Sequence, residues 1–536
     1  MTAPLLSVEG LTIALPPGGD RANAVEDVSL TLNPGEILCV VGESGSGKSM
    51  TASAVMGLLP RGLPVTSGRI MFEGRDLLAL DPEAFRRLRG ARLGMVFQEP
   101  MTALNPLMRV GEQIAEAFRM HGERGDIRAK VLALLEDVRL PDPPALIDAY
   151  PFRLSGGQRQ RVMIAMALAL GPSVLVADEP TTALDVTTQM QILRLIRALQ
   201  ERRGTGVLFI THDFGVVAEI ADRVAVMQHG RVVEQGEARQ VLERPAHPYT
   251  RALIAAVPHG RARPPAARGE TALALEGVAK SFRRGGGLFR RGKPIEAVAD
   301  ATFTIARGET LGLVGESGSG KSTLARCVVR LVEPDRGSVV FGGTDLLQLS
   351  RAAMRPFRSR IQMVFQDPYA SLNPRRRVGD IIAEGPVTHG VTRAEALRRA
   401  RELLALVQLD PGAMDRFPHE FSGGQRQRIG IARALALEPE LLVADEPVSA
   451  LDVSVQAQIL ALLDDIRHRL GLTMLFITHD LRVAAQVCDR IAVMRQGRIV
   501  ELGETAQVFG APAHPYTREL LDAIPGKAWT PPLAAA

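Results

Sequence analysis

An eight-residue stretch at 42–49, GESGSGKS, constrains this chain more than any other part of its sequence. It follows a short apolar run at 36–41 and precedes a helix-compatible run at 50–59. A glycine-rich loop in this context lets backbone N–H groups approach phosphate oxygens, and the helix N-terminus adds favourable partial charge. The stretch therefore predicts a phosphate-binding loop between a strand and a helix.

Two side chains of the loop carry its expected chemistry. Lys48 would place a point charge on the β- and γ-phosphates, and the Ser49 hydroxyl would bind Mg²⁺. A ligand-free glycine turn is the alternative, but the same eight letters recur at 315–322, which makes chance untenable. The predicted nucleotide contacts of the two loops are Gly42, Ser44, Gly45, Gly47, Lys48, Ser49, Gly315, Ser317, Gly318, Gly320, Lys321 and Ser322.

Four further motifs recur along the chain at a constant spacing of 267 residues, against 273 residues for the two loops. SGGQRQR occurs at 155–161 and 422–428, ADEP at 177–180 and 444–447, ITHD at 210–213 and 477–480, and HPYTR at 247–251 and 514–518. We predict a tandem duplication with domains at 1–256 and 272–536, joined by a Pro-, Arg- and Ala-rich linker at 257–271. An insertion containing 283–294 precedes the second loop.

Short apolar runs alternate with helical patterns inside the first copy. Strands are expected at 36–41, 93–97, 173–177 and 207–210, a half-buried strand at 27–32, and a hairpin at 223–236. Ile192, Leu195, Ile196 and Leu199 recur on one helical face. Alternating strands and helices favour an α/β domain with a mainly parallel sheet covered on both faces.

Composition indicates a soluble protein without a strong electrostatic partner. The 536 residues suffice for at least two domains, and 46% hydrophobic with 23% charged residues is ordinary for globular proteins. A net charge of +5 is too weak over this length to indicate a nucleic-acid partner. Lysines make up only six of the 64 basic residues, so Lys48 and Lys321 look position-specific.

The cysteines and the apolar runs favour the cytosol. Cys39, Cys327 and Cys488 lie far apart, with neither metal-ligand spacing nor a disulfide framework, and we interpret them as small buried hydrophobes. No stretch reaches about 18 uninterrupted apolar residues, the length expected of a membrane-spanning helix. Residues 1–10 have neither the basic nor the apolar region of a secretory signal.

Polar residues follow the apolar runs downstream of each loop. In the first copy, one buried-strand pattern ends in Asp178, predicted to hold Mg²⁺ directly or through water, and Glu179, predicted to polarise the attacking water. Gln98 and His212 follow two other strand-like runs. Taken alone, the glutamine would be interpreted as a surface residue and the histidine as a satisfied buried one.

The stretches LSGGQ at 154–158 and FSGGQ at 421–425 settle the interpretation. Here the chain resembles the ATP-binding-cassette (ABC) ATPases over essentially all of its length. The resemblance implies two tandem P-loop ABC-type nucleotide-binding domains. Each would contain a mainly parallel sheet core, a helical subdomain and a small antiparallel β part. ATP and Mg²⁺ would be the ligands, and ATP hydrolysis the reaction.

In this family the signature opens a helix whose N-terminus and serine contact the γ-phosphate held by the other domain, so the resemblance implies two composite sites. One would combine Lys48, Ser49, Gln98, Asp178, Glu179 and His212 with Ser422 and Gly424, and the other Lys321, Ser322, Gln366, Asp445, Glu446 and His479 with Ser155 and Gly157. The catalytic residues would be Glu179, Glu446, His212, His479, Gln98 and Gln366, and the Mg²⁺ ligands Ser49, Gln98, Asp178, Ser322, Gln366 and Asp445. The signature contacts would be Ser155, Gly156, Gly157, Gln158, Ser422, Gly423, Gly424 and Gln425, and Asp185 and Asp452 resemble the residues that bridge the sites.

Further motifs resemble the oligopeptide, dipeptide and nickel importer class. They are FQEP with LNP at 97–106, FQDP with LNP at 365–374, and HPYT near the end of each copy. The fused arrangement is similar to the double ATPases of peptide, microcin C and glutathione importers. Some relatives carry a C-terminal cysteine cluster for an iron–sulfur centre. No cysteine follows the HPYT motif in either copy, so no cluster is expected.

The chain departs from the family pattern at the adenine and signature positions. Family members usually stack an aromatic residue on adenine, and Phe282 fits that place in the second copy, whereas Leu15 takes it in the first. The second signature begins with Phe421 instead of leucine. Neither change touches a residue that handles phosphate.

The resemblance implies the ATP-hydrolysing subunit of an importer for peptides or peptide-like solutes. It would sit peripherally on the cytoplasmic face of the inner membrane and drive two separate permeases, fed by an extracytoplasmic binding protein. The alternative is a soluble tandem ABC ATPase that acts on ribosomes or DNA. The short linker and the lack of zinc-type cysteines and long coiled coils disfavour it. The permeases and binding protein, and not this chain, would select the solute.

Overall fold

The computed structural model describes residues 3–18, 21–182, 184–258, 269–283, 294–449 and 451–529. These residues divide into two compact units, one made of 3–257 together with 524–529, the other of 258–523. Most of the predicted linker at 257–271 and of the predicted insertion at 283–294 lies outside the described residues. In the described part of the chain, none of the helices combines the length and the apolar character that a membrane span needs.

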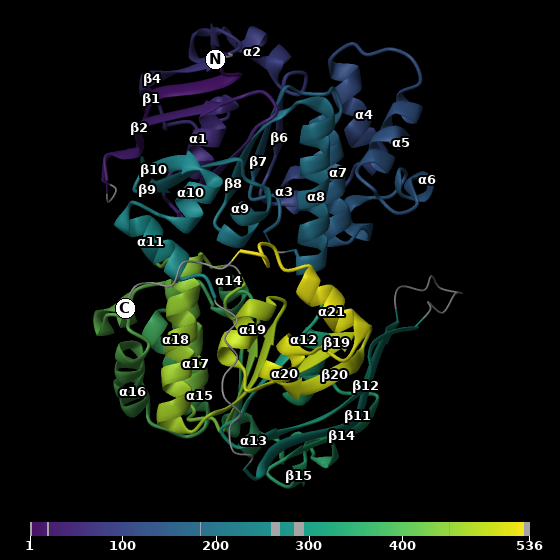
Figure 1. The fold of residues 1–536 in the computed structure, drawn as a ribbon. Helices are drawn as coiled ribbons and strands as arrows, with labels where there is room; N and C mark the ends of the chain where they lie inside the picture. The colour runs from purple at the N-terminus through teal and green to yellow at the C-terminus, as the bar shows by residue number, and fades with distance from the viewer. Residues whose placement is uncertain are drawn as a thin grey trace. The chain divides into compact units, whose positions relative to one another are not determined.

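The first unit is an α/β structure (Figure 1). Its strands are β1 Leu6–Ala14, β2 Asn23–Leu32, β3 Ile37–Val41, β4 Val65–Phe72, β5 Arg75–Asp76, β6 Leu93–Val96, β7 Val174–Asp178, β8 Gly206–Thr211, β9 Arg223–Gln228 and β10 Arg231–Glu237. Its helices are α1 Lys48–Val55, α2 Pro82–Leu88, α3 Pro100–Ala103, α4 Val110–Met120, α5 Ile127–Asp137, α6 Pro143–Leu146, α7 Gly156–Leu168, α8 Val186–Arg203, α9 Phe214–Ile220, α10 Ala238–Glu243 and α11 Pro248–Ala255.

A six-stranded sheet with the order β10-β9-β3-β8-β7-β6 forms the centre of the first unit. Its neighbours pair in parallel except β9 and β10, which form the predicted antiparallel hairpin. Every residue of β3, β7 and β8 is buried, which is why these strands read as continuous apolar runs. The carboxyl ends of parallel strands meet at one edge of a sheet. The residues after β3, β6, β7 and β8 therefore converge.

Two further layers complete the first unit. Strands β2-β1-β4-β5 form a separate antiparallel sheet, and its apolar residues share one core cluster with α1 and the central sheet. Helices α4–α6 lie together on the side of the unit away from β1, β2 and β4 (Figure 1). These layers correspond to the predicted antiparallel part and helical subdomain.

The second unit repeats this arrangement. Its strands are β11 Thr271–Arg283, β12 Pro294–Ala306, β13 Thr310–Val314, β14 Arg336–Phe341, β15 Thr344–Asp345, β16 Ile361–Val364, β17 Leu441–Asp445, β18 Thr473–Thr478, β19 Arg490–Arg495 and β20 Arg498–Glu504. Its helices are α12 Lys321–Val328, α13 Arg355–Arg360, α14 Pro368–Ser371, α15 Val378–Thr388, α16 Arg393–Leu406, α17 Gly423–Leu435, α18 Val453–Leu470, α19 Leu481–Val487, α20 Thr505–Gly510 and α21 Pro515–Asp522.

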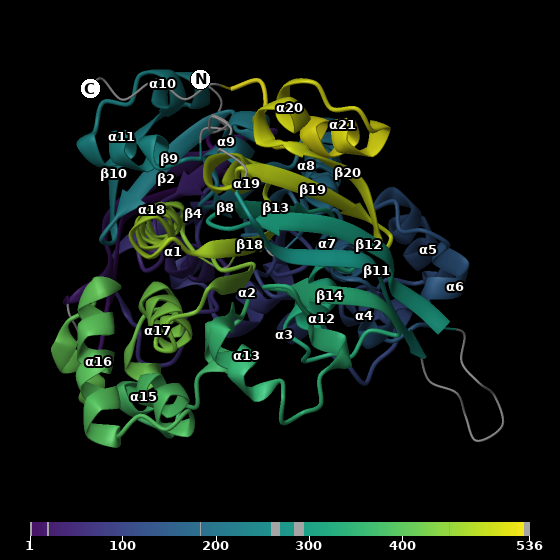
Figure 2. The same ribbon diagram turned by 90° about the horizontal axis from the view of Figure 1, so that it is seen from below.

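The sheets of the second unit are joined where those of the first are separate. A single parallel bridge between Asp300 and Arg498 links β12 to β20, so the strands form one ten-stranded sheet. Figure 2 shows α15–α17 grouped away from β11 and β12. The prediction of an α/β fold with mainly parallel sheet cores is confirmed for both units.

The last described residues of the chain belong to the first unit. The backbone N–H of Gly526 donates to Glu219 Oε2 on α9 at 3.2 Å. A Cβ added at Gly526 would lie 2.7 Å from the Gly215 carbonyl oxygen, so the two backbones approach each other as only glycine allows. The first and the last described stretches of the chain thus contribute to this unit.

Candidate functional site

The loop at 42–49 is shaped by close contacts of its glycines with backbone. A Cβ at Gly42 would overlap the carbonyl oxygen of Met227 at the end of β9. A Cβ at Gly47 would lie 2.9 Å from the Ala24 carbonyl oxygen, and Gly47 has a φ of 103°. Both positions therefore require glycine. Gly315 and Gly320 make the equivalent approaches to Met494 and Ala297 in the second unit.

The lysine of each loop is a buried cation held on backbone carbonyls. Lys48 is 5% exposed, and its Nζ donates to Gly42 O at 2.7 Å and to Glu43 O at 2.8 Å. Lys321, 4% exposed, donates to Gly315 O and Glu316 O, both at 2.8 Å. A buried ammonium at the start of a helix favours an anionic ligand. This is the electrostatic environment that a phosphate group needs.

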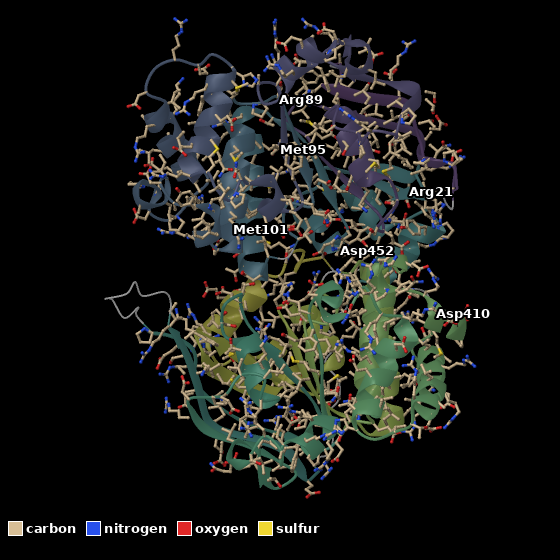
Figure 3. All side chains as sticks on the ribbon, turned by 180° about the vertical axis from the view of Figure 1, so that it is seen from behind. Arg21, Arg89, Met95, Met101, Asp410 and Asp452 are labelled. Carbon is tan, nitrogen blue, oxygen red and sulfur yellow. The ribbon has the colours of Figure 1, made fainter. Side chains whose placement is uncertain are left out.

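An arginine that the sequence analysis did not single out also contacts the first loop. Arg21, labelled in Figure 3, comes from the connection between β1 and β2, and its guanidinium donates to the Gly45 carbonyl oxygen. Ser44 and Gly45 themselves are exposed at the tip of the loop. They are therefore accessible to a bound nucleotide.

The serine and the aspartate of each predicted Mg²⁺ site are in contact in both units, whereas Gln98 and Gln366 contact the glutamates Glu179 and Glu446. Ser49 Oγ donates to Asp178 Oδ1 at 3.0 Å, and Ser322 Oγ donates to Asp445 Oδ1 at 2.9 Å. Burial raises the pKa of Asp178 and Asp445, and a bound cation would favour their charged forms. Mg²⁺ prefers oxygen ligands and is usually held by one or two carboxylates together with substrate phosphates. These hydroxyl and carboxylate groups fit it.

Glu179 stands at the centre of a polar network at the carboxyl edge of the first sheet. Its Oε2 accepts from Gln98 Nε2 at 3.0 Å and from Thr182 Oγ1 at 2.8 Å, and its Oε1 lies 3.3 Å from His212 Nδ1. Burial acts to raise the pKa of Glu179, but His212, Thr182 and Lys48 together lower it to about 2. The carboxylate is therefore charged and fixed in orientation.

The second unit builds a similar network, except that Ser449, the counterpart of Thr182, donates to the backbone carbonyl oxygen of Glu446 at 3.2 Å. Glu446 Oε2 accepts from Gln366 Nε2 at 2.9 Å and lies 3.1 Å from His479 Nδ1. Despite burial, which opposes both shifts, this contact lowers the pKa of Glu446 and raises that of His479. Glu179 and Glu446 share a φ of 46°, a left-handed conformation rare for residues other than glycine. Both glutamates thus carry local backbone strain, which clusters at functional sites.

The signature residues begin the helices α7 and α17. Ser155 and Gln158 form a capping box, in which Ser155 N donates to Gln158 Oε1 at 2.9 Å and Gln158 N donates to Ser155 Oγ at 3.3 Å. Ser422 and Gln425 repeat it. Gly157 is needed for packing, because its Cβ would lie 2.5 Å from Thr188 Cγ2 on α8. Gly424 meets Val455 in the same way, whereas Gly156 and Gly423 have ordinary contact distances.

The two adenine positions differ. Phe282 at the end of β11 is 45% exposed, and Lys280 Nζ lies 5.8 Å from its ring centroid. Leu15 is partly buried and packs against the core of the first unit.

The aspartates that resemble bridging residues also differ between the two cassettes. Asp185 caps α8 by accepting from Thr188 N at 2.9 Å, whereas Asp452, labelled in Figure 3, has no side-chain cap hydrogen bond at the start of α18.

Besides Arg21, sequence reasoning missed three side chains that contact these groups. Thr182 donates to the carboxylate of Glu179, and a hydroxyl three residues after each glutamate (Thr182 or Ser449) was the available signal. Tyr249 Oη accepts from Glu43 N at 3.2 Å, and Tyr516 Oη accepts from Glu316 N at 3.3 Å. The HPYT repeat marked these tyrosines, but local patterns gave no reason to place them at the loops.

Comparison with known proteins matches most of the chain to transporter proteins. Residues 25–182 and 298–449 match the ABC transporter family, and 233–280 and 500–530 match the oligopeptide/dipeptide transporter C-terminal region. The chain is 48% identical to the glutathione import ATP-binding protein GsiA of Salmonella typhimurium, over 97% of this chain and 89% of that protein. It is 47% identical to GsiA of Escherichia coli O157:H7 over the same shares.

ATP-binding cassettes are among the solved structures that match about half of this chain. The dimeric ATP-binding cassette MJ0796, in a post-hydrolysis state bound to ADP and Pi, aligns with 29% identity and a TM-score of 0.40 over 44% of this chain and 98% of that chain. The family matches, which cover both copies, and the relatives, which cover nearly the whole chain, confirm the resemblance seen in the sequence. The chain belongs to the ABC transporter family and is an ATP-binding protein with two ATPase cassettes.

Proposed function

We propose that this protein is the ATP-hydrolysing subunit of an importer for peptides or peptide-like solutes such as glutathione. The observation that carries the proposal is the polar network around the glutamate of both cassettes, combined with the C-terminal region typical of oligopeptide and dipeptide transporters. The relatives named as glutathione import proteins support the solute class. Its partners are two membrane permeases and an extracytoplasmic binding protein. The chain itself lies at the cytoplasmic face of the inner membrane.

Each cassette contributes binding and hydrolysis through its own residues. Lys48 and Lys321 neutralise phosphate charge, and the paired hydroxyl and carboxylate groups hold Mg²⁺ together with the glutamines Gln98 and Gln366. Bound Mg²⁺ would supply charge stabilisation at the phosphates. Glu179 and Glu446 orient and polarise the attacking water, while His212 and His479 hold these carboxylates in place.

We further propose that each site is completed by the signature of the other cassette. The N-termini of α7 and α17 present backbone N–H groups that favour a phosphate. Lys48 would therefore share a nucleotide with Ser422 and Gly424, and Lys321 with Ser155 and Gly157. ATP binding draws the cassettes together in this scheme, and hydrolysis releases them. In the second copy, the ring of Phe282 would stack on adenine.

The pairing of loop and signature predicts which cysteines crosslink. A protein carrying Ser49→Cys and Ser422→Cys should form an ATP-dependent crosslink when the double variant is treated with a short bifunctional reagent. Ser49→Cys combined with Ser155→Cys is the matched control, because both positions belong to one cassette. Gel mobility under non-reducing conditions measures the product. A crosslink in the control pair instead would refute the composite sites.

The import function predicts a transport defect in cells that lack the protein. Uptake of labelled glutathione and tripeptides should fall when its gene is deleted, and return with the wild-type chain but not with Glu179→Gln/Glu446→Gln. The alternative, action on ribosomes or DNA, predicts cosedimentation with ribosomes or retention on DNA instead. Normal uptake of every peptide tested, together with ribosome or DNA binding, would reject the importer and leave the ATPase assignment intact.

A further inference from the structure

The HPYT motif near the end of each cassette has a structural role at the phosphate loop. Tyr249 lies on α11, 206 residues after Glu43 in the sequence, yet its hydroxyl oxygen accepts from Glu43 N at 3.2 Å. Tyr516 on α21 makes the same contact with Glu316 N at 3.3 Å. The chain has only four tyrosines, and two of them occupy this position.

Glu43 and Glu316, which the tyrosines contact, also hold the lysine of each loop. The carbonyl oxygen of Glu43 accepts from Lys48 Nζ at 2.8 Å and from Ser46 N at 3.1 Å. In the second cassette, Glu316 O accepts from Lys321 Nζ at 2.8 Å. A single residue at the entry of each loop is thus fixed at both ends, by the tyrosine at its N–H and by the lysine at its carbonyl. A rotation of the backbone at Glu43 or Glu316 would therefore displace the lysine.

The tyrosine itself is rigidly placed by the rest of the motif. His247 caps α11, where its Nδ1 accepts from Tyr249 N at 3.2 Å, and Pro248 occupies the first helical position. The Glu234 carboxylate on β10 accepts from Ala246 N at 2.7 Å and His247 N at 3.1 Å. His514, Pro515 and Glu501 repeat these roles around Tyr516, which is 2% exposed.

A second contact braces the same loop from the same part of the cassette. The turn between β9 and β10 donates from Gly230 N to Ser46 O at 3.0 Å, and Gly497 N donates to Ser319 O at 2.9 Å. The hairpin and the HPYT helix therefore hold the loop at two backbone points. Neither contact involves the amides at the end of the loop and the start of the helix, which are expected to face phosphate. The two contacts therefore leave the phosphate-facing amides of the loop accessible.

We propose that Tyr249 and Tyr516 are positioning residues for nucleotide binding, whose hydroxyls keep the phosphate loops in the form that accepts ATP. The inference rests on ATP binding at these loops but not on the importer function. Without the hydroxyl, a backbone donor at the loop entry loses its partner, and the loop gains conformations that satisfy this N–H elsewhere. ATP must then select the competent conformation from a mixture, which weakens binding.

The test removes each hydroxyl in proteins that keep one lysine. Tyr249→Phe should weaken Mg–ATP binding about tenfold, or ~1.4 kcal/mol, in a Lys321→Ala protein, where the loop of Lys48 remains. Tyr516→Phe should have this effect in a Lys48→Ala protein. Tyr150→Phe is the control, because Tyr150 stacks on Phe152 with ring centroids 5.6 Å apart and lies outside the motif. Titration with a fluorescent ATP analogue gives the Kd, and thermal melting without nucleotide reports the fold.

The pattern across the two backgrounds separates positioning from general stability. The proposal requires each tyrosine variant to weaken binding in the protein that retains the lysine of its own loop. It is overturned if melting temperatures fall while the Kd stays as in the parent proteins. It is equally overturned if both variants weaken binding to the same extent in both backgrounds, since a general loss of stability would do so.

Discussion

Glu179→Gln combined with Glu446→Gln is expected to abolish most ATP turnover while ATP binding is retained. The amide keeps the shape of the side chain but cannot accept a proton from the attacking water. Loss of a positioned general base typically costs about 10²–10⁴-fold in rate. Gln98 and Gln366, at 3.0 Å and 2.9 Å from these carboxylates, can also hold the amide, and the contacts of Lys48 and Lys321 with the loop carbonyls are unchanged. The protein should therefore accumulate with ATP bound.

Phosphate release under saturating ATP measures turnover, and nucleotide retained after rapid gel filtration measures occupancy. A matched control is Glu243→Gln, which alters a surface pair with Arg239 at 2.9 Å on α10. The control should hydrolyse ATP at the wild-type rate. Steady-state turnover of the double variant at the wild-type rate would show that these glutamates do not act on the water.

Gly42→Ala together with Gly315→Ala is expected to eliminate measurable ATP binding. The added methyl groups would overlap the carbonyl oxygens of Met227 and Met494, which are backbone atoms of central strands and cannot move aside cheaply. The loops must then shift as a whole, and with them the carbonyls that hold Lys48 and Lys321. We expect binding at least about 100-fold weaker, ~2.7 kcal/mol.

Equilibrium titration with Mg–ATP tests this expectation, and far-ultraviolet circular dichroism confirms that the variant is folded. Gly62→Ala is the control, because a Cβ there meets nothing within 4 Å although its φ is also positive, at 96°. This control carries backbone strain without the overlap. Wild-type affinity in the double variant would mean that the loops tolerate displacement.

The residues that meet at the sheet edge could be predicted because each follows a recognisable strand. The apolar runs that became β3, β6, β7 and β8 all end at one edge, so Gln98, Glu179 and His212 had to converge once the sheet was parallel. The bounds of these four strands differ from the predicted ones by at most one residue, whereas β2, predicted at 27–32, begins four residues earlier at Asn23. A strand that is buried on both faces is a continuous apolar run, and such a run can be recognised in the local sequence.

Contacts between distant parts of the chain could not be predicted in this way. The hydroxyl of Tyr249 at the loop depends on where α11 packs, which no local period encodes. The left-handed backbone of Glu179 likewise results from its surroundings, since glutamate has no preference for that conformation. The bridge of Asp300 and Arg498 that joins the sheets of the second unit has no sequence signal at all.

The membership of residues 524–529 in the first unit has a consequence for biosynthesis. A ribosome that has finished the first copy must still translate the whole second copy before Gly526 emerges to meet Glu219. At about 5–20 residues per second, this interval is on the order of tens of seconds. The first unit is thus the first to begin folding and the last to be completed. Trp529, the sole tryptophan of the chain, is part of that final segment and so provides a built-in optical signal of completion.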